Sequence, residues 1–448
     1  MPPSERAAQA QVAAARADAL LVRALGVRQL AASIFNYTVG SGIFALPALA
    51  VARLGGAAPL AYLVCALVMA LVVLCFAEAG SRVASTGGPY AYVEVALGPF
   101  VGFIAGVMLF VTGLTAGAAV AVLFAKSLTA LVPGAAGGLS WLPPVLIVVV
   151  IAALAHVNVR GVRRSARIVE IMTLAKLVPL ITFVIVGAVF VQPAHFVWSA
   201  TPSLSGVLGS AGIVIFAFSG IESALTPSGE VHTPWRTVPR ASFLALGAAT
   251  LLYLAIQGVA LGILGPALAL NDTTPLAEAA AAFAGAPGRL LMIVGATVSM
   301  LGYLSGNILS VPRSLFAFAR DGFLPQSLSS VHARHHTPHV AIVVYAGLVI
   351  ALAVSGTFEH LAVLANLTAF VLYILCGAAV WMLRRRDVRT SGKPFQIPGG
   401  PLIPLASCLA NGWLIYATAG RQDASGIGAL VAIAVALYLV RKYRKRVR

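Results

Sequence analysis

A stretch of 23 residues without a charge, from Leu30 to Ala52, constrains the fold more than any other feature of the sequence. A helix of this length, rising about 1.5 Å per residue, can cross the hydrocarbon core of a bilayer. Its centre is Gly40-Ser41-Gly42, and such residues weaken a helix and free its backbone groups. In lipid, freed backbone groups must face protein, water or a ligand. The stretch therefore predicts a membrane-spanning helix that is interrupted near its middle.

A second interrupted stretch lies 178 residues further along the chain. Ser219-Gly220-Ile221 repeats Ser41-Gly42-Ile43, and each copy is followed by an Ala-Leu pair and then a proline. Paired interrupted helices at corresponding positions are the best sequence indication of the binding site in a secondary transporter. We therefore interpret the two breaks as parts of one site.

Composition and charge define the class of protein. Hydrophobic residues make up 60% of the chain and charged residues only 10%, whereas about a quarter of the residues in a soluble globular protein are charged. The chain is therefore expected to be a polytopic membrane protein, in contact with the lipid bilayer. The net charge of +17 does not indicate a nucleic-acid partner, because Lys and Arg lie in short loops between apolar runs with almost no aromatic residues among them.

Twelve apolar runs predict an all-α fold with about 12 transmembrane helices. The runs cover about 29–53, 58–81, 98–130, 142–160, 168–192, 204–229, 239–266, 286–318, 338–356, 359–383, 400–420 and 425–441. The first five (29–192) and the next five (204–383) would form a 5+5 inverted repeat with helices 1 and 6 interrupted, because an odd number of spans per half reverses the orientation. Two extra helices (400–441) follow, between a tail of residues 1–28 and a basic tail of residues 442–448.

The distribution of positive charge predicts the orientation. If the N-terminus is cytoplasmic, the cytoplasmic segments carry 25 Lys and Arg residues and the outer segments carry four. Positive residues accumulate in cytoplasmic loops, so both termini are expected inside, in a multi-pass protein of the cell membrane. Residues 1–27 lack an apolar core that ends in a cleavage site, so no cleaved signal peptide is expected.

The two breaks offer complementary chemistry. The first exposes the N-terminus of a half-helix at Ser41, Gly42 and Ile43, where free amides and the positive end of the dipole favour a carboxylate. The first half of the other span ends at Phe216-Ala217-Phe218, where carbonyl groups favour an ammonium group. Together they suit a zwitterion. The alternative is that these glycines only allow helices to pack closely.

Four motifs follow one another along the chain. They are Gly40-Ser41-Gly42-Ile43-Phe44, Gly87-Gly88-Pro89-Tyr90-Ala91-Tyr92, Phe218-Ser219-Gly220-Ile221-Glu222-Ser223-Ala224 and Ala319-Arg320-Asp321-Gly322-Phe323-Leu324-Pro325. Over nearly all of spans 1 to 10 the sequence resembles the amino acid-polyamine-organocation (APC) superfamily of transporters. The resemblance implies a permease that moves amino acids across the membrane by alternating access.

The resemblance also implies roles for individual residues. Substrate-binding positions are Thr38, Ser41, Gly42 and Ile43 at the carboxylate end, Phe216 as an aromatic lid, and Thr112, Gly113 and Asn307 in the side-chain pocket, with Ser219 and Gly220 at the second break. This sequence departs from many members at Asn36 and Tyr37, which either narrow the pocket or only repack it. The arginine-type exchangers have tryptophans at the positions of Phe216 and Asn307, which argues against a guanidinium substrate.

The 25 cytoplasmic and four outer Lys and Arg residues leave one of the 30 unassigned, Lys176, which lies in the fifth span and is followed by sixteen residues without a charge. An ionisable group in a span indicates function, and a buried ammonium group can gain and lose a proton during transport. By resemblance, proton-coupled members have a lysine in similar surroundings where sodium-coupled relatives bind an ion. The alternative is snorkelling, since Lys176 is roughly 13 Å along the helix from the cytoplasmic Arg167. We expect proton coupling.

Three other groups of polar residues each leave two interpretations open. Glu222 either takes part in proton coupling or faces a cationic substrate, or it complements the dipole in the first turn of a half-helix. Glu78 and Arg82, four residues apart, suit a structural ion pair better than a transport role. The histidines of the basic loop suit a solvated loop better than a metal site; they are His332, His335, His336 and His339.

No motif for hydrolytic, redox or ATP-driven chemistry occurs in the sequence, so neither an enzyme, nor a cofactor, nor a metal site is expected. The four cysteines lie in apolar runs and are expected to be small buried hydrophobes. A neutral amino acid is favoured, because the expected side-chain pocket lacks an acid. An antiporter that exchanges a cationic amino acid for its decarboxylated amine, a polyamine transporter, and a channel or sensor on the same scaffold stay open, as does the choice between monomer and homodimer.

Overall fold

The computed structural model describes most of the chain as helices. The described residues are 25–83, 87–129, 139–160, 162–198, 201–226, 228, 231–271, 274–320, 322–389 and 392–447. Most of the predicted 1–28 tail therefore lies outside them. Within them the only extended pairing is a single parallel bridge between Leu25 and Val231. The all-helical class is confirmed.

Helices of membrane-spanning length dominate the part of the chain that the structure describes. Eight are long and apolar enough to cross a bilayer, and the bent pair described below makes nine. The eight are α4 (Pro59–Arg82), α6 (Pro99–Thr129), α8 (Leu142–Val159), α10 to α11 (Leu204–Ala224), α12 with η6 (Pro234–Leu270), α13 to α14 (Pro275–Arg320), α16 (Phe358–Arg385) and the Ser425–Tyr443 part of α18 (Arg421–Val447). Shorter apolar helices are Leu174–Phe190, which joins the later part of α9 (Val162–Gly187) to the 3-10 turn η2 (Ala188–Phe190), α15 (His339–Ser355) and α17 (Leu402–Thr418). A polytopic membrane protein follows, while the count of twelve spans and the inverted repeat stay predictions.

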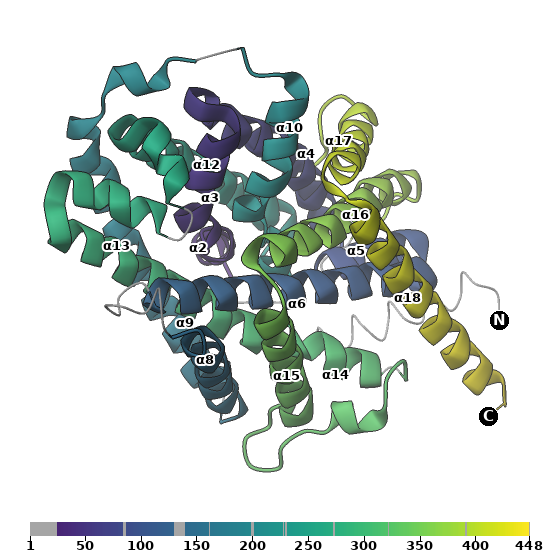
Figure 1. Ribbon diagram of the computed structural model, residues 1–448. Helices are drawn as coiled ribbons and strands as arrows, with labels where there is room; N and C mark the ends of the chain where they lie inside the picture. Colours follow the sequence, from purple (N-terminus) through teal and green to yellow (C-terminus); the bar gives the residue numbers. More distant parts are fainter. Residues whose placement is uncertain are drawn as a thin grey trace.

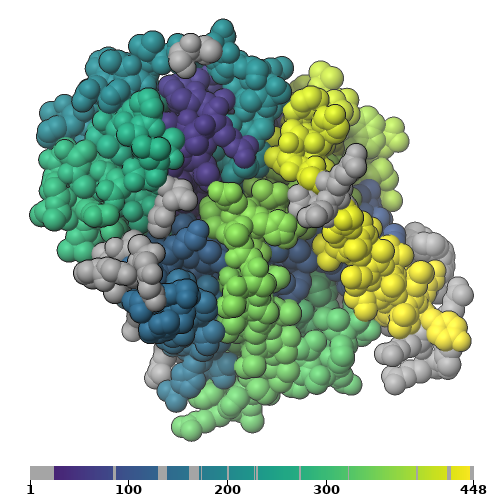
Figure 2. Space-filling model, in the orientation of Figure 1, coloured from purple at the N-terminus to yellow at the C-terminus, as the bar shows by residue number. Residues whose placement is uncertain are grey.

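Apolar side chains cover the outside of the bundle. Leu174 on α9 is 66% exposed, Ile185 on the same helix 67%, and Leu251 on α12 72%. Patches of this kind would be a liability in water and are the expected surface of a helix in lipid. Of the eight spans, α18 is the least buried, with only 6% of its apolar stretch covered by the rest of the protein. It extends along the edge of the bundle (Figures 1 and 2).

Both predicted breaks are present. Helix α2 (Val27–Thr38) ends before the break, and α3 (Gly42–Leu54) begins after it in a direction bent by 49°. In the second span, α10 (Leu204–Val214) tightens into the 3-10 turn η4 (Ile215–Phe218) and stops at Gly220, which has φ of 119°. That left-handed conformation favours glycine. The short helix α11 (Ile221–Ala224) then continues the chain.

Two short helices flank the spans. Helix α5 (Pro89–Leu97) begins at the proline that follows Gly87-Gly88. Helix α13 is broken at Gly285, whose φ is 60°, so that residues 275–284 form a separate short helix ahead of the longer part. Proline at the first turn of both helices fits a position where no backbone donor is needed. The long helix α6 runs through the middle of the bundle, against α5, α13, α15 and α16 (Figure 1).

Candidate functional site

The two breaks line a narrow cavity, in which the empty space amounts to about 420 Å³ when the part open to solvent is included. Most of the lining residues come from α2, α3, α6 and the second break. They are Tyr37, Thr38, Gly40, Ser41, Gly42, Thr112, Gly113, Ala116, Val120, Phe216, Ser219, Gly220, Glu222, Ser223, Tyr303 and Ala365. The cavity thus brings together eight of the twelve residues predicted to bind substrate.

Glycines allow the two breaks to touch. A Cβ atom on Gly42 would lie 2.8 Å from the Cα of Ala217, so α3 begins against the backbone of the second break. A Cβ atom on Gly220 would lie 2.7 Å from the carbonyl oxygen of Tyr37, so the second break lies against the end of α2. Both separations are shorter than a real Cβ atom tolerates, so only glycine fits at these two positions. The repeated Ser-Gly-Ile sequence therefore serves close approach as well as interruption.

The N-terminus of α3 brings a buried hydroxyl to the cavity, and this hydroxyl has no hydrogen-bond partner among the described residues. The first amides of any helix have no acceptor within the helix. Ser41, which precedes α3, is 1% exposed, and its hydroxyl makes no hydrogen bond with the described residues. Because a buried hydroxyl without a partner is costly, this group is suited to an acceptor or donor that is brought by a ligand.

At the second break the helix N-terminus is already occupied. The amide of Gly220 donates to both carboxylate oxygens of Glu222, at 3.0 and 3.1 Å, and the hydroxyl of Tyr373 donates to Oε2 at 2.9 Å. Glu222 therefore sits in the first turn of α11, where an acid complements the dipole. It also lines the cavity, so its position is compatible with both interpretations.

Side chains from three other helices bind the carbonyl groups of the first break. The Nζ atom of Lys176 on α9 donates to the carbonyl oxygen of Asn36 at 2.8 Å, to its Oδ1 at 2.6 Å and to the carbonyl oxygen of Val39 at 2.6 Å. These bonds use all three donors of an ammonium group. Lys176 is 1% exposed, so its ammonium group is directed at the break and does not snorkel.

The other two are hydroxyls. Tyr253 on α12 has its oxygen 2.7 Å from the carbonyl oxygen of Thr38, and Ser299 on α13 donates to the carbonyl oxygen of Gly40 at 3.1 Å. Together with Lys176, they satisfy carbonyl groups that the interruption of the helix would otherwise leave without donors. The break is thus held by side chains from α9, α12 and α13.

Four predicted substrate contacts lie outside the cavity lining. They are Ile43, Ala217, Phe218 and Asn307. Asn307 instead donates from Nδ2 to the carbonyl oxygen of Gly113 at 2.9 Å and accepts from the hydroxyl of Tyr345. Phe218 packs edge-on against Tyr253, with ring centroids 5.0 Å apart. These residues therefore pack behind those that line the cavity.

The side-chain end of the cavity is largely apolar. Ala116, Val120 and Ala365 line it, beside Gly113. The hydroxyl of Thr112 lies 2.9 Å from both the carbonyl oxygen of Met108 and the hydroxyl of Thr368, so it is already paired. Sequence analysis missed Ala116 and Val120, although they follow Thr112 at four-residue spacing on the same helix face. Tyr303 lies four residues before Asn307 and could have been found in the same way.

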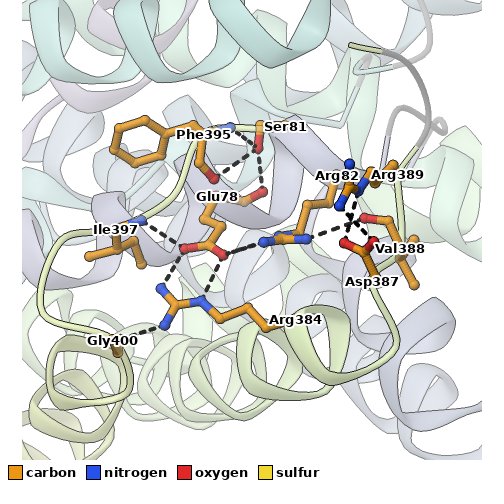
Figure 3. A network of polar contacts seen from close by, with 10 residues as sticks. All are labelled: Glu78, Ser81, Arg82, Arg384, Asp387, Val388, Arg389, Phe395, Ile397 and Gly400. Atoms are coloured by element: carbon orange, nitrogen blue, oxygen red, sulfur yellow. Dashed lines mark hydrogen bonds and ion pairs between the residues drawn. The ribbon is translucent and has the colours of Figure 1, made fainter. Parts of the chain in front are cut away.

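Glu78 forms a separate buried network near the ends of α4 and α16 (Figure 3). Its Oε1 accepts from Nε of Arg82 at 3.0 Å and from Nε of Arg384 at 2.7 Å. Its Oε2 accepts from Arg384 Nη2 at 2.6 Å and from the amide of Ile397 at 2.9 Å. The carboxylate thus holds the segment that follows α16 against α4. The predicted Glu78–Arg82 ion pair is present, and none of these residues lines the cavity.

The histidine-rich loop makes mostly local contacts. The ring of His332 lies 4.7 Å from that of His335 and 5.3 Å from that of His339. Its Nδ1 accepts from the amides of Arg334 and His335. Within the described residues, no group of three or more His, Cys, Asp and Glu side chains is arranged to hold a metal ion.

Known transporters are similar to this chain over almost its whole length. Residues 25–440 match the family model described as amino acid permease. The branched-chain amino acid permease BcaP of Bacillus subtilis is 28% identical over 89% of each chain. An uncharacterized transporter of Mycobacterium tuberculosis is 31% identical over 94% of this chain and 92% of its own. The serine/threonine exchanger SteT of Bacillus subtilis is 28% identical over 92% of this chain and 95% of its own.

Proposed function

The chain belongs to the amino acid permease family, and on that premise we propose that it is a secondary active transporter of neutral amino acids that works by alternating access. The observation that carries the proposal is the contact between the two breaks around a cavity. One side of the cavity is a helix N-terminus with a serine hydroxyl that has no partner in the described part of the chain, and the other contains the carboxylate of Glu222. These are partners for the two ends of a zwitterion.

The carboxylate of the substrate would bind at α3. Free amides at Gly42 and Ile43, the positive end of the helix dipole and the hydroxyl of Ser41 all favour an anion there. The predicted role of Thr38, Ser41, Gly42 and Ile43 is retained in this proposal. Ile43 contributes its backbone amide, because its side chain is outside the cavity lining.

The ammonium group would bind near the second break. Two of the carbonyl groups predicted to receive it already have donors in the protein: the amide of Ser219 lies 3.3 Å from the carbonyl oxygen of Phe216, and the hydroxyl of Tyr253 lies 2.7 Å from that of Ala217. A carbonyl oxygen has two lone pairs and can accept a second hydrogen bond. The Glu222 carboxylate, when ionised, would add negative charge to the same side of the cavity.

The substrate side chain would be neutral and of limited size. It would face Ala116, Val120 and Ala365, with Phe216 as the aromatic lid. A cationic side chain would need a second carboxylate, and Glu222 is already shared between Gly220 and Tyr373. The names of BcaP and SteT, a branched-chain permease and a serine/threonine exchanger, agree with a neutral substrate. The second candidate, an antiporter of cationic amino acids or amines, is favoured by the carboxylate of Glu222 in the cavity lining.

The remaining parts of the proposal concern topology and energy. We infer about twelve spans arranged as an inverted 5+5 repeat with two additional helices, and a cell membrane location with both termini in the cytoplasm. Lys176 would couple transport to protons, because its ammonium group occupies the position in which a bound cation could otherwise join α2 to α9. Monomer and homodimer are both compatible with this mechanism.

Uptake into proteoliposomes tests the substrate class. Purified protein would be given a panel of labelled amino acids and polyamines, each competed with unlabelled compounds. We expect competition from aliphatic and small hydroxylated amino acids. Competition from cationic amino acids or polyamines alone would refute the neutral class in favour of the antiporter. Uptake of inorganic ions without saturation would indicate a channel.

A further inference from the structure

The hydroxyl of Tyr253 touches both interrupted spans. Tyr253 lies in the middle of α12 and is fully buried. Its oxygen is 2.7 Å from the carbonyl oxygen of Thr38, the last residue of α2, and 2.7 Å from that of Ala217 in η4. Lys176 and Ser299 hold carbonyl groups of the first break, whereas Tyr253 holds one carbonyl group from each break.

Loss of this double contact would leave buried carbonyl groups without a donor, which is unfavourable in free energy. Carbonyl groups in the last turn of a helix have no donor within the helix, and a buried polar group without a partner is costly. The hydroxyl has one proton, which is shared between two acceptors at equal distance. The two carbonyl groups are therefore held near one point although they belong to different spans.

The aromatic ring is itself fixed. Phe218 packs edge-on against it with an interplanar angle of 86°, and the ring of Tyr62 packs against it with centroids 6.4 Å apart. Tyr253 is not a lining residue of the cavity. It can act on substrate only through the backbone at Thr38 and Ala217, and Ala217 is the residue against which Gly42 packs.

We propose that Tyr253 is a positioning residue whose hydroxyl couples the two breaks, so that the end of α2 and the η4 turn move as one unit during transport. The role in transport rests on the proposed function, and the mechanical coupling does not. The hydroxyl also fixes the separation between the carboxylate end and the ammonium end of the cavity.

Tyr62 provides a matched control. It is also a fully buried tyrosine in the same aromatic cluster, but its hydroxyl has no hydrogen-bond partner among the described residues. Tyr253→Phe and Tyr62→Phe thus each remove one buried oxygen and keep the ring. We expect Tyr253→Phe to lower the maximal exchange rate roughly tenfold, the effect of losing about one buried hydrogen bond. Tyr62→Phe should stay within about twofold of wild type.

Hydrogen–deuterium exchange tests the coupling without any substrate. Peptides that cover residues 36–44 and 214–224 should both exchange faster in Tyr253→Phe and should be unchanged in Tyr62→Phe. Faster exchange in only one peptide, no change in either, or the same change in both variants would overturn the proposal. If wild type transports no amino acid, the proposed function fails while this comparison still decides whether the breaks are coupled.

A rescue variant separates positioning from packing. 4-Aminophenylalanine at position 253 keeps the ring and places N–H donors where the hydroxyl stood. Both the slow exchange of the two peptides and the transport rate should return toward wild type. If Tyr253→Phe fails to fold, the rescue variant and wild type are still compared by the same two measurements. A rescue variant that folds but behaves as Tyr253→Phe does, or that loses the joint protection of the two peptides, would overturn the proposal.

Discussion

Arg384, near the end of α16, reaches 306 residues back along the chain to Glu78 on α4, with Nη2 of the arginine 2.6 Å from Oε2 of the carboxylate. Glu78 is completely buried, and Arg82 binds the other carboxylate oxygen. The amide of Ile397 completes the set, so one carboxylate joins two helices and the segment after α16. The network does not line the cavity, but it fixes α4, which packs against α12 and whose Tyr62 ring lies against that of Tyr253.

Glu78→Gln is expected to destabilise the protein strongly. Removing one partner from a buried ion pair costs about 3–5 kcal/mol, because the remaining charge loses its counter-charge in a poorly solvated place. The measurement is the melting temperature of the purified protein in detergent. Arg384→Gln should cost less, since Arg384 is 20% exposed and Glu78 keeps its bonds to Arg82 and Ile397.

Asp387→Asn is the control for the loss of a carboxylate. Asp387 lies in the loop after α16, where the hydrogen bond from Arg389 lowers the pKa of its carboxyl group. Both residues of this pair are more than half exposed, and exposed pairs contribute little to stability. Its melting temperature should match that of wild type. An equal decrease for Glu78→Gln and Asp387→Asn would show that burial of Glu78 does not matter.

Gly42→Ala is expected to abolish transport. The added methyl group would lie 2.8 Å from the Cα of Ala217, and neither backbone can move without separating the breaks. Gly247→Ala on α12 is the control, since a Cβ atom there has open space and a mid-helix Gly→Ala change is normally stabilising. Uptake and melting temperature would be measured for both. Wild-type uptake by Gly42→Ala would refute the close approach of the two breaks.

Ser41→Ala should separate binding from stability. The Ser41 hydroxyl has no partner among the described residues, so its removal should leave the melting temperature unchanged or raise it. If the hydroxyl binds the substrate carboxylate, KM should rise roughly tenfold, as expected for one hydrogen bond to a charged group.

Ser210→Ala is the matched control for Ser41→Ala. Its hydroxyl is also buried without a partner among the described residues, but it lies on α10 outside the cavity lining. Its KM should not change. A similar KM for both variants would remove Ser41 from the binding site.

Much of this arrangement follows from local sequence. The interruptions at Gly40-Ser41-Gly42 and Ser219-Gly220, and the short helix after Gly87-Gly88-Pro89, depend on residues that break or begin helices within a few positions. That Lys176 needs a polar partner also follows from its place in an apolar run, whereas the choice of Asn36 and Val39 as partners comes from the fold. The interruptions and the short helix need no knowledge of how distant helices pack.

Contacts between distant helices could not be derived in this way. A tyrosine in the middle of an apolar run, such as Tyr253, has no local signal that its hydroxyl reaches two breaks. In the sequence, Arg384 is only one of several positive residues after an apolar run, and the fold alone places it on Glu78. Asn307 lies one turn after Tyr303 on α13, but its amide binds Gly113 on α6 and Tyr345 on α15 and does not line the cavity, which only the packing of these helices determines.

The orientation in the membrane is testable by cysteine labelling. Arg386, after the end of α16, is exposed and is expected in the cytoplasm, whereas Leu270, at the end of η6, is 83% exposed and is expected outside. With the four native cysteines replaced, an impermeant maleimide added to intact cells should label Leu270→Cys at once. Arg386→Cys should be labelled only after permeabilisation. The reverse pattern would contradict the cytoplasmic position of both termini.

Lys176 provides the test of energy coupling. In liposomes with an imposed pH gradient, wild type should accumulate substrate without sodium, because protonation of Lys176 on one side and its release on the other shifts the conformational equilibrium. Lys176→Ala should lose this accumulation and retain exchange. Lys176→Gln keeps an N–H donor near the carbonyl groups of Asn36 and Val39 but cannot titrate, so it should exchange faster than Lys176→Ala and still fail to accumulate. Accumulation by Lys176→Ala with an unchanged pH dependence, or a sodium requirement in wild type, would show that the lysine only stabilises the carbonyl groups at the first break and does not couple transport to protons.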